Sequence, residues 1–136
     1  METTPMLHPR VIYVEDEAFF AGTMAKLLND SGYPTLTTSD GESGFDIIKK
    51  YKPELVLLDL VLPKVDGQEL VRKIKNDPET SKISVIVLSN LSGDATQSDL
   101  HKIGVDGFFV KAFTLPSVIV AEIQRRLGPP TTRPTQ

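Results

Sequence analysis

Three carboxylates, a hydroxyl and an ammonium group stand out in this 136-residue sequence because they follow short apolar runs. Carboxylates that gather repel one another, and burial adds to the cost of their charge. A hard divalent cation relieves that repulsion, since Mg²⁺ binds oxygen ligands and is usually held by one or two carboxylates. The residue types therefore suit a magnesium site. The five side chains are those of Glu15, Asp16, Asp59, Ser89 and Lys111.

Asp59 is the best candidate nucleophile of this set because it closes a buried apolar run. With a metal ion present, a carboxylate can attack a phosphoryl group and form an acyl phosphate. The Lys111 ammonium group and the Ser89 hydroxyl can then stabilise the charge on the phosphoryl oxygens. We expect Lys111 to pair with Asp59 before the reaction. Pro63 and Gly67 predict a turn after Asp59 whose backbone carbonyls approach a ligand.

The apolar runs that precede these residues predict β-strands. Leu55–Leu58 and Val85–Leu88 are apolar throughout, which indicates strands that are buried on both faces. The other runs are short, and the first is rich in β-branched and aromatic residues. The expected strands cover residues 11–14, 34–38, 55–58, 85–88 and 108–110.

Amphipathic segments between the strands predict five helices, because apolar residues recur in them at helical spacing. Ser39 and Glu42, three residues apart, predict a capping box at the start of the second helix. Thr114 is the expected cap of the last helix, which Gly128 ends. The helices are expected around residues 20–28, 39–51, 68–75, 94–103 and 114–127.

Five strands that alternate with five helices predict an α/β fold, a doubly wound five-stranded parallel sheet with helices on both faces. The flavodoxin-like strand order 2-1-3-4-5 is one of the two common doubly wound arrangements. In such a sheet, ligands bind outside the carboxyl ends of the strands, where the strand order reverses. The five polar side chains are therefore expected to converge on one edge of the sheet.

Length and composition suggest one domain. We expect a flexible segment over residues 1–9, the folded domain over 10–127, and a disordered tail or truncated linker over 128–136. The net charge of −3 argues against unaided binding of nucleic acid. The absence of cysteine excludes thiolate metal sites and fits a reducing compartment. With no apolar run of the ~20 residues that span a bilayer and no signal-peptide pattern, we expect a cytoplasmic protein without membrane contact.

Four motifs at the ends of the expected strands resemble, in order, those of the receiver domain of bacterial two-component response regulators, of the chemotaxis-regulator-like kind. The resemblance covers roughly residues 10–127, and four ordered motifs make it specific. It implies phosphorelay signal transduction, in which a histidine kinase or phosphotransfer protein donates a phosphoryl group to Asp59. The motifs are Val-Glu15-Asp16-Glu, Leu-Asp59-Leu-Val-Leu-Pro63-Lys-Val-Asp66-Gly67, Leu-Ser89 and Phe108-Phe-Val-Lys111.

The resemblance also implies how Mg²⁺, the expected cofactor, would be held. Asp16 and Asp59 would ligate the ion directly, together with the backbone carbonyl of Val61. Glu15 would act through a water molecule. Such a domain catalyses only its own phosphorylation and dephosphorylation, so no other enzymatic activity is expected.

A switch in packing is the implied consequence of phosphorylation. Ser89 and Lys111 would bind the phosphoryl oxygens, and Ser89 would move inward. Phe108, an aromatic ring without a hydroxyl, would then swing in behind it. This change would remodel the face made by the fourth helix, the fifth strand and the fifth helix, where a downstream effector or a second copy docks.

Some residues depart from the family pattern. Ala112 stands where a cis-bonded proline is usual, and we predict a trans bond before it, because a cis bond to a residue other than proline costs about 2.5–4 kcal/mol. Asn90 stands where a very small residue is usual, and it is expected to narrow access for the phosphodonor. Val61 and Leu91 are apolar and cannot orient an attacking water, which predicts slow loss of phosphate.

Three other functions stay open at this point. An aspartate-nucleophile phosphatase or phosphotransferase would need a second carboxylate two residues after the nucleophile as general acid, where this chain has Val61. A flavin- or nucleotide-binding module would need a Gly- or Ser/Thr-rich loop after the first strand, where this chain has three acidic residues. A receiver that docks or dimerises without phosphorylation is disfavoured by the intact acidic set, but Ala112 and Asn90 keep it open.

Overall fold

A computed structural model describes residues 8–90 and 94–131. Within these residues, five parallel strands form one sheet in the order β2-β1-β3-β4-β5, which confirms the predicted fold. The strands are β1 (Val11–Val14), β2 (Thr35–Thr38), β3 (Leu55–Leu58), β4 (Ser84–Ser89) and β5 (Gly107–Val110). The helices are α1 (Ala18–Asp30), α2 (Gly41–Tyr51), α3 (Gly67–Asn76), α4 (Asp94–Lys102) and α5 (Pro116–Leu127), with a 3-10 turn η1 (Lys111–Phe113) after β5.

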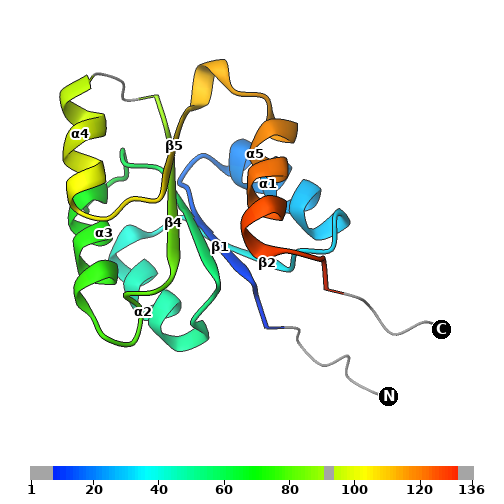
Figure 1. Cartoon of the computed structure of the whole chain (residues 1–136), viewed down its shortest axis with the longest axis horizontal. Coiled ribbons are helices and arrows are strands. Elements are labelled where there is room, and N and C mark those ends of the chain that lie inside the picture. Colours follow the sequence, from blue (N-terminus) through cyan, green and yellow to red (C-terminus); the bar gives the residue numbers. More distant parts are fainter. Residues whose placement is uncertain (1–7, 91–93, 132–136) are drawn as a thin grey trace.

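Two layers of helices cover the sheet, with α2, α3 and α4 on one side and α1 and α5 on the other (Figure 1). Side chains alternate between the two faces along each strand. In β1, Val14 belongs to one core cluster and Tyr13 to the other. β3 is buried at every position, as predicted, because it lies between β1 and β4. In the described part of the chain, no helix has the length and apolar character needed to cross a membrane.

The start of α2 differs from the prediction. Asp40 is the N-cap, and its carboxylate accepts a hydrogen bond from the Glu42 N–H at 2.8 Å. The capping box predicted for Ser39 is therefore wrong, because the helix begins one residue later and aspartate is as good a cap as serine. Asp66 caps α3 in the same way, accepting a hydrogen bond from the Gln68 N–H at 3.0 Å.

The last helix begins one residue later than predicted. α5 starts at Pro116 with Leu115 at its N-cap. Proline suits the first turn of a helix because it lacks an N–H and its φ angle is already helical. Thr114, the predicted cap, instead donates its hydroxyl to the carbonyl of Val110 at 2.7 Å. The predicted cap is thus wrong. The Thr114 hydroxyl instead stabilises the turn after β5.

The segment after α5 is fastened to the amino-terminal edge of the sheet. Arg10, just before β1, donates from its guanidinium group to the carbonyls of Leu127 and Pro129, each at 2.8 Å. The same group lies 5.2 Å from the ring centroid of Tyr33, whose hydroxyl donates to the Gly128 carbonyl at 2.6 Å. Pro129 and Gly128 thus contact residues just before β1 and before β2. Residues 1–7 and 132–136 lie outside the described part.

Arg10→Ala is expected to lower the free energy of unfolding by about 2 kcal/mol, a magnitude typical of hydrogen bonds made by a charged group. The variant loses the bonds to α5 and the segment after it, and also an ion pair with Glu54. Urea unfolding measures the change. Lys26→Ala is the matched control, because Lys26 pairs with Asp30 on the exposed surface. Equal losses in the two variants would contradict the anchoring role.

Candidate functional site

A buried lysine lies among three carboxylates at the carboxyl edge of the sheet. Lys111 follows β5, and its Nζ atom is 2.8 Å from Glu15 Oε1, 2.8 Å from Asp59 Oδ2 and 3.0 Å from Glu17 Oε1. Its side chain is 2% exposed, and lysine is almost never fully buried unless paired. Burial by itself would lower the pKa of Lys111, but its hydrogen bonds to Asp59, Glu15 and Glu17 outweigh burial and raise the pKa above its ordinary value. The predicted pairing of Lys111 with Asp59 is confirmed.

Asp59 and Glu15 are also held by backbone N–H groups. Asp59 directly follows β3 and is buried, and its Oδ1 accepts a hydrogen bond from the Val61 N–H at 3.0 Å. Glu15 directly follows β1 and is buried, and its Oε2 accepts a hydrogen bond from the Glu17 N–H at 3.1 Å. Each carboxylate is thus oriented by the loop that follows its own strand.

The loop after β1 sends its acidic side chains in different directions. Glu15, Glu17 and Asp59 form a group in which one carboxylate oxygen from each residue lies within 4.8 Å of the others. Asp16 is exposed and does not belong to this group, which is drawn from the described residues only. Glu17 was not among the predicted site residues. The signal that would have found it is the alternation of side chains along an extended chain, which puts residues 15 and 17 on the same side.

The charges in this group do not balance. When ionised, the three acids carry three negative charges, of which Lys111 offsets one. A divalent cation would balance the remaining two. All the acidic donor atoms are oxygens, the ligands that Mg²⁺ prefers. The residues present therefore fit a magnesium ion.

The end of β4 lies beside the turn that carries the lysine. Ser89, the last residue of β4, is fully buried and pairs in the sheet with Val110. Asn90 follows it, and its Oδ1 accepts a hydrogen bond from the Ala112 N–H at 2.8 Å. The Lys111–Ala112 bond is trans, as predicted. Asn90 thus anchors the turn after β5, a contact that sequence reasoning missed.

The sequence also named Phe108 as the ring of the switch and Leu91 as an apolar residue that would prolong the lifetime of the phosphate. Phe108 in β5 is half-buried and packs against the core beneath α2, α3 and α4. Its motion as a switch ring stays a prediction. Leu91 lies outside the described residues.

Large apolar side chains are exposed on the segments that surround Lys111 and Asp59. Phe19 lies in the first turn of α1, Val61 follows β3, and Phe113 and Leu115 follow β5. These four residues, here called the apolar rim, are between 59% and 88% exposed. They belong to the same segments as the acids and the lysine, so the apolar rim borders the candidate site.

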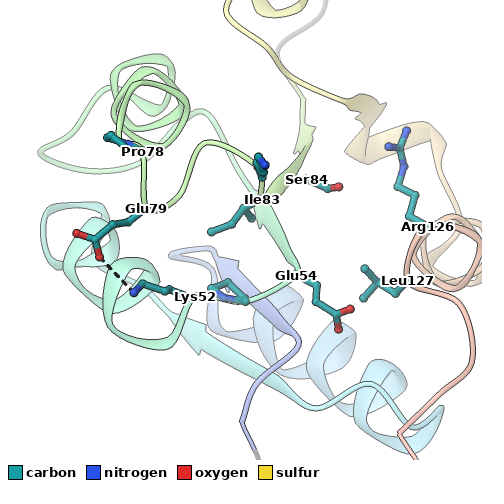
Figure 2. Close-up of a pocket in the computed structure, with 10 residues that line it drawn as sticks. Lys52, Glu54, Pro78, Glu79, Ile83, Ser84, Arg126 and Leu127 are labelled. Atoms are coloured by element: carbon teal, nitrogen blue, oxygen red, sulfur yellow. Dashed lines mark ion pairs between the residues drawn. The ribbon is translucent and has the colours of Figure 1, made fainter.

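A surface pocket of about 460 Å³ lies at the opposite edge of the sheet. Its lining includes Lys52 and Glu54 before β3, Ser84 at the start of β4, and Arg126 near the end of α5 (Figure 2). Lys52 and Glu79, which both line the pocket, form an ion pair at 3.2 Å (Figure 2). Because ligands of doubly wound sheets bind at the carboxyl edge, we do not assign the function to this pocket.

The chain is similar to a family model and to several known proteins. The family model described as "Response regulator receiver domain" matches residues 11–124. The chain is 32% identical over 127 residues to the phosphate regulon transcriptional regulatory protein PhoB of Pseudomonas aeruginosa, covering 91% of this chain and 55% of PhoB. It is 28% identical over 109 residues to the polar-differentiation response regulator DivK of Brucella anthropi, covering 80% of this chain and 89% of DivK. The chain thus spans about half the length of the transcriptional regulators it matches.

Solved structures of response regulators are also similar to this chain. The phosphorylated cyanobacterial phytochrome response regulator RcpA has a TM-score of 0.80 and 26% identity, covering 90% of this chain and 96% of RcpA. The Mn²⁺-bound form of response regulator Rcp1 has a TM-score of 0.75 and 26% identity, covering 93% of this chain and all of Rcp1. Each of these is a similarity, and none identifies which residues of this chain act.

Proposed function

The chain belongs to the response regulator receiver domain family, and on that premise we propose that it is a phospho-accepting signalling domain of a two-component system. Asp59 accepts a phosphoryl group from a histidine kinase or phosphotransfer protein, with Mg²⁺ as cofactor. The observation that carries the proposal is the buried Lys111 between Asp59 and Glu15. An ammonium group in that place can neutralise Asp59 before the transfer and the phosphoryl oxygens after it.

The proposed step is a displacement at phosphorus. An oxygen of the Asp59 carboxylate forms a bond to phosphorus while the bond from phosphorus to a donor imidazole nitrogen breaks. The imidazole leaves with the electron pair and takes up a proton. The Val61 N–H orients Asp59 through Oδ1, and Lys111 binds Oδ2. Lys111 and the Ser89 hydroxyl then stabilise the charge on the phosphoryl oxygens.

Mg²⁺ would be held by the loop after β1 and by the end of β3. The residues assigned to it are Asp16 and Asp59, the carbonyl of Val61, and Glu15 through water. When bound, the ion supplies positive charge to the transferring phosphoryl group. Support comes from the oxygen donors at this edge and from the similarity to Mn²⁺-bound Rcp1. Glu17 lies near enough to Asp59 to contribute a further oxygen.

Incubation with acetyl phosphate and Mg²⁺, read by intact mass, tests the proposal. The wild-type protein is expected to gain one phosphoryl group, and EDTA is expected to prevent the gain. A receiver domain of known activity, treated in parallel, shows that the reagent works. No gain in this chain would contradict the proposal and favour a receiver that docks or dimerises without phosphorylation.

The apolar rim is the proposed docking surface for the protein phosphodonor, because exposed apolar patches beside polar groups mark protein contacts. Phe113→Asp is expected to slow transfer from a histidine kinase by about tenfold relative to transfer from acetyl phosphate, as loss of an interface anchor does. The ratio of the two rates is the measurement. Leu27→Asp, at an apolar position of lower exposure near the end of α1, is the control. If Phe113→Asp left the ratio of the two transfer rates unchanged, docking of the phosphodonor at the apolar rim would be contradicted.

Slow loss of the phosphate is also expected. The side chains of Val61 and Leu91 carry no polar atom. Neither side chain can readily orient an attacking water. Intact mass measured over time after removal of acetyl phosphate gives the lifetime, and Val61→Asn should shorten it. A half-life of seconds in the wild-type protein would contradict this expectation.

We propose that phosphorylation shifts the domain between two packings of its side chains. Ser89 moves toward the phosphoryl group and the Phe108 ring follows, which changes the face made by α4, β5 and α5. A protein effector or a second copy of the chain docks there. The proposal includes no direct contact with nucleic acid or membrane and no enzymatic activity beyond the domain's own phosphorylation and dephosphorylation. We also propose a cytoplasmic location, because a sequence without cysteine fits a reducing compartment.

A further inference from the structure

A buried tyrosine touches the acidic group from within the core. Tyr13 lies in β1 two residues before Glu15, so the two side chains share one face of the sheet. The tyrosine is fully buried, and its ring belongs to the core cluster that includes Met24 and Ile119. Its hydroxyl donates a hydrogen bond to Glu15 Oε1 at 2.7 Å. The contact joins the rigid core directly to a carboxylate of the candidate site.

Glu15 has three hydrogen-bond donors, and they come from different segments. Oε1 accepts from the Tyr13 hydroxyl and lies 2.8 Å from Lys111 Nζ, while Oε2 accepts from the Glu17 N–H. The lysine moves to the phosphoryl group in the proposed reaction, and Glu17 lies on a loop. Tyr13 is the donor that lies in the sheet itself. A tyrosine hydroxyl is protonated at neutral pH, and the Tyr13 hydroxyl donates to Glu15.

We propose that Tyr13 is a positioning residue of the phosphorylation site, whose hydroxyl fixes the Glu15 carboxylate for the divalent cation and for Lys111. The inference rests on the proposed function, because it concerns the same site. A hydrogen bond of this kind orients a group that holds the metal, and removal of such a partner typically weakens metal binding by about 10–100-fold. Tyr13 is therefore expected to matter for Mg²⁺ affinity although it does not touch the phosphoryl group.

Tyr13→Phe and Tyr33→Phe form a matched pair for the test. Both tyrosines are buried, and the hydroxyl of each makes one hydrogen bond, to Glu15 at the site and to Gly128 at the opposite edge. Amide NMR shifts on titration with Mg²⁺, without phosphodonor, give the dissociation constant. It is expected to rise about tenfold in Tyr13→Phe and to stay unchanged in Tyr33→Phe.

The rate of phosphorylation by acetyl phosphate supplies a second readout. In Tyr13→Phe, the Mg²⁺ concentration that gives half the maximal rate should rise by about the same tenfold factor, whereas the rate at saturating Mg²⁺ should stay close to wild type. A general loss of structure would lower the rate at every Mg²⁺ concentration. In a Glu15→Gln background, Tyr13→Phe should have no further effect on Mg²⁺ affinity, because coupled residues are not additive.

The outcomes separate the inference from the proposed function. Equal Mg²⁺ affinities for Tyr13→Phe and Tyr33→Phe, with Mg²⁺ binding and phosphorylation intact in the wild-type protein, would overturn the role of Tyr13 alone. So would an undiminished effect of Tyr13→Phe in the Glu15→Gln background. A wild-type protein that neither binds Mg²⁺ nor accepts phosphate would overturn the proposed function and the inference together.

Discussion

Asp59→Asn is expected to abolish phosphorylation. On incubation with acetyl phosphate and Mg²⁺, the variant should gain no mass and the wild-type protein one phosphoryl group, because the amide lacks the anionic oxygen that attacks phosphorus. A beryllofluoride salt with Mg²⁺ should likewise shift amide NMR signals of the wild-type protein only. A mass gain in the variant equal to that of the wild type would place the phosphate elsewhere.

The same variant is expected to be more stable than the wild-type protein in EDTA. Asparagine removes one of three negative charges whose oxygens lie within 4.8 Å, and like charges at that distance destabilise one another. Mg²⁺ should stabilise the wild-type protein more than Asp59→Asn, since only a state that binds the ion gains from it. Thermal unfolding with and without Mg²⁺ measures both effects. Asp30→Asn, at an exposed carboxylate, is the control and should show neither.

Lys111→Met is expected to act in the opposite direction on stability. Glu15 and Asp59 are buried, and loss of the ammonium group leaves their charges uncompensated. Breaking a buried ion pair by removing one partner typically costs about 3–5 kcal/mol. Urea unfolding in EDTA measures the loss, and Mg²⁺ should recover part of it by replacing the missing positive charge.

Phosphorylation should also slow in Lys111→Met, by roughly 100-fold at saturating Mg²⁺, the usual effect of losing one group that stabilises developing charge. Initial rates with acetyl phosphate give this factor. Lys26→Met is the matched control, because Lys26 is an exposed lysine of α1 that pairs with a single aspartate. A Lys111→Met protein as stable in EDTA as Lys26→Met would show that the buried charges do not depend on this lysine.

The edge of the sheet at which the chemistry gathers could be predicted from the sequence. Glu15, Asp59, Ser89 and Lys111 each end or follow a strand, and parallel strands end at the same edge of a sheet. The strand order was also accessible, since alternating strands and helices with right-handed connections leave few arrangements. These features depend on local periodicity and on chain topology, both of which the sequence carries.

Choices between neighbouring residues of similar type were not accessible. Ser39 and Asp40 are equally good caps in sequence, and only the point at which α2 begins makes Asp40 the cap. Asp16 and Glu17 are both acidic and both exposed, and only the path of the loop after β1 places Glu17, and not Asp16, in the group beside Lys111. A one-residue difference in the path of the chain decides each case.

Contacts between distant segments belong to the tertiary structure alone. The hydrogen bond of Asn90 with Ala112 joins residues 22 apart in sequence, and that of Arg10 with Pro129 joins residues 119 apart. The sequence by itself determined the fold, the edge of the sheet where the acids and the lysine gather, and the kinds of side chain found there. Only the packing of the helices on the sheet decided which carboxylates meet Lys111 and that Tyr13 holds one of them, because such contacts depend on side-chain directions and distances that no local pattern contains.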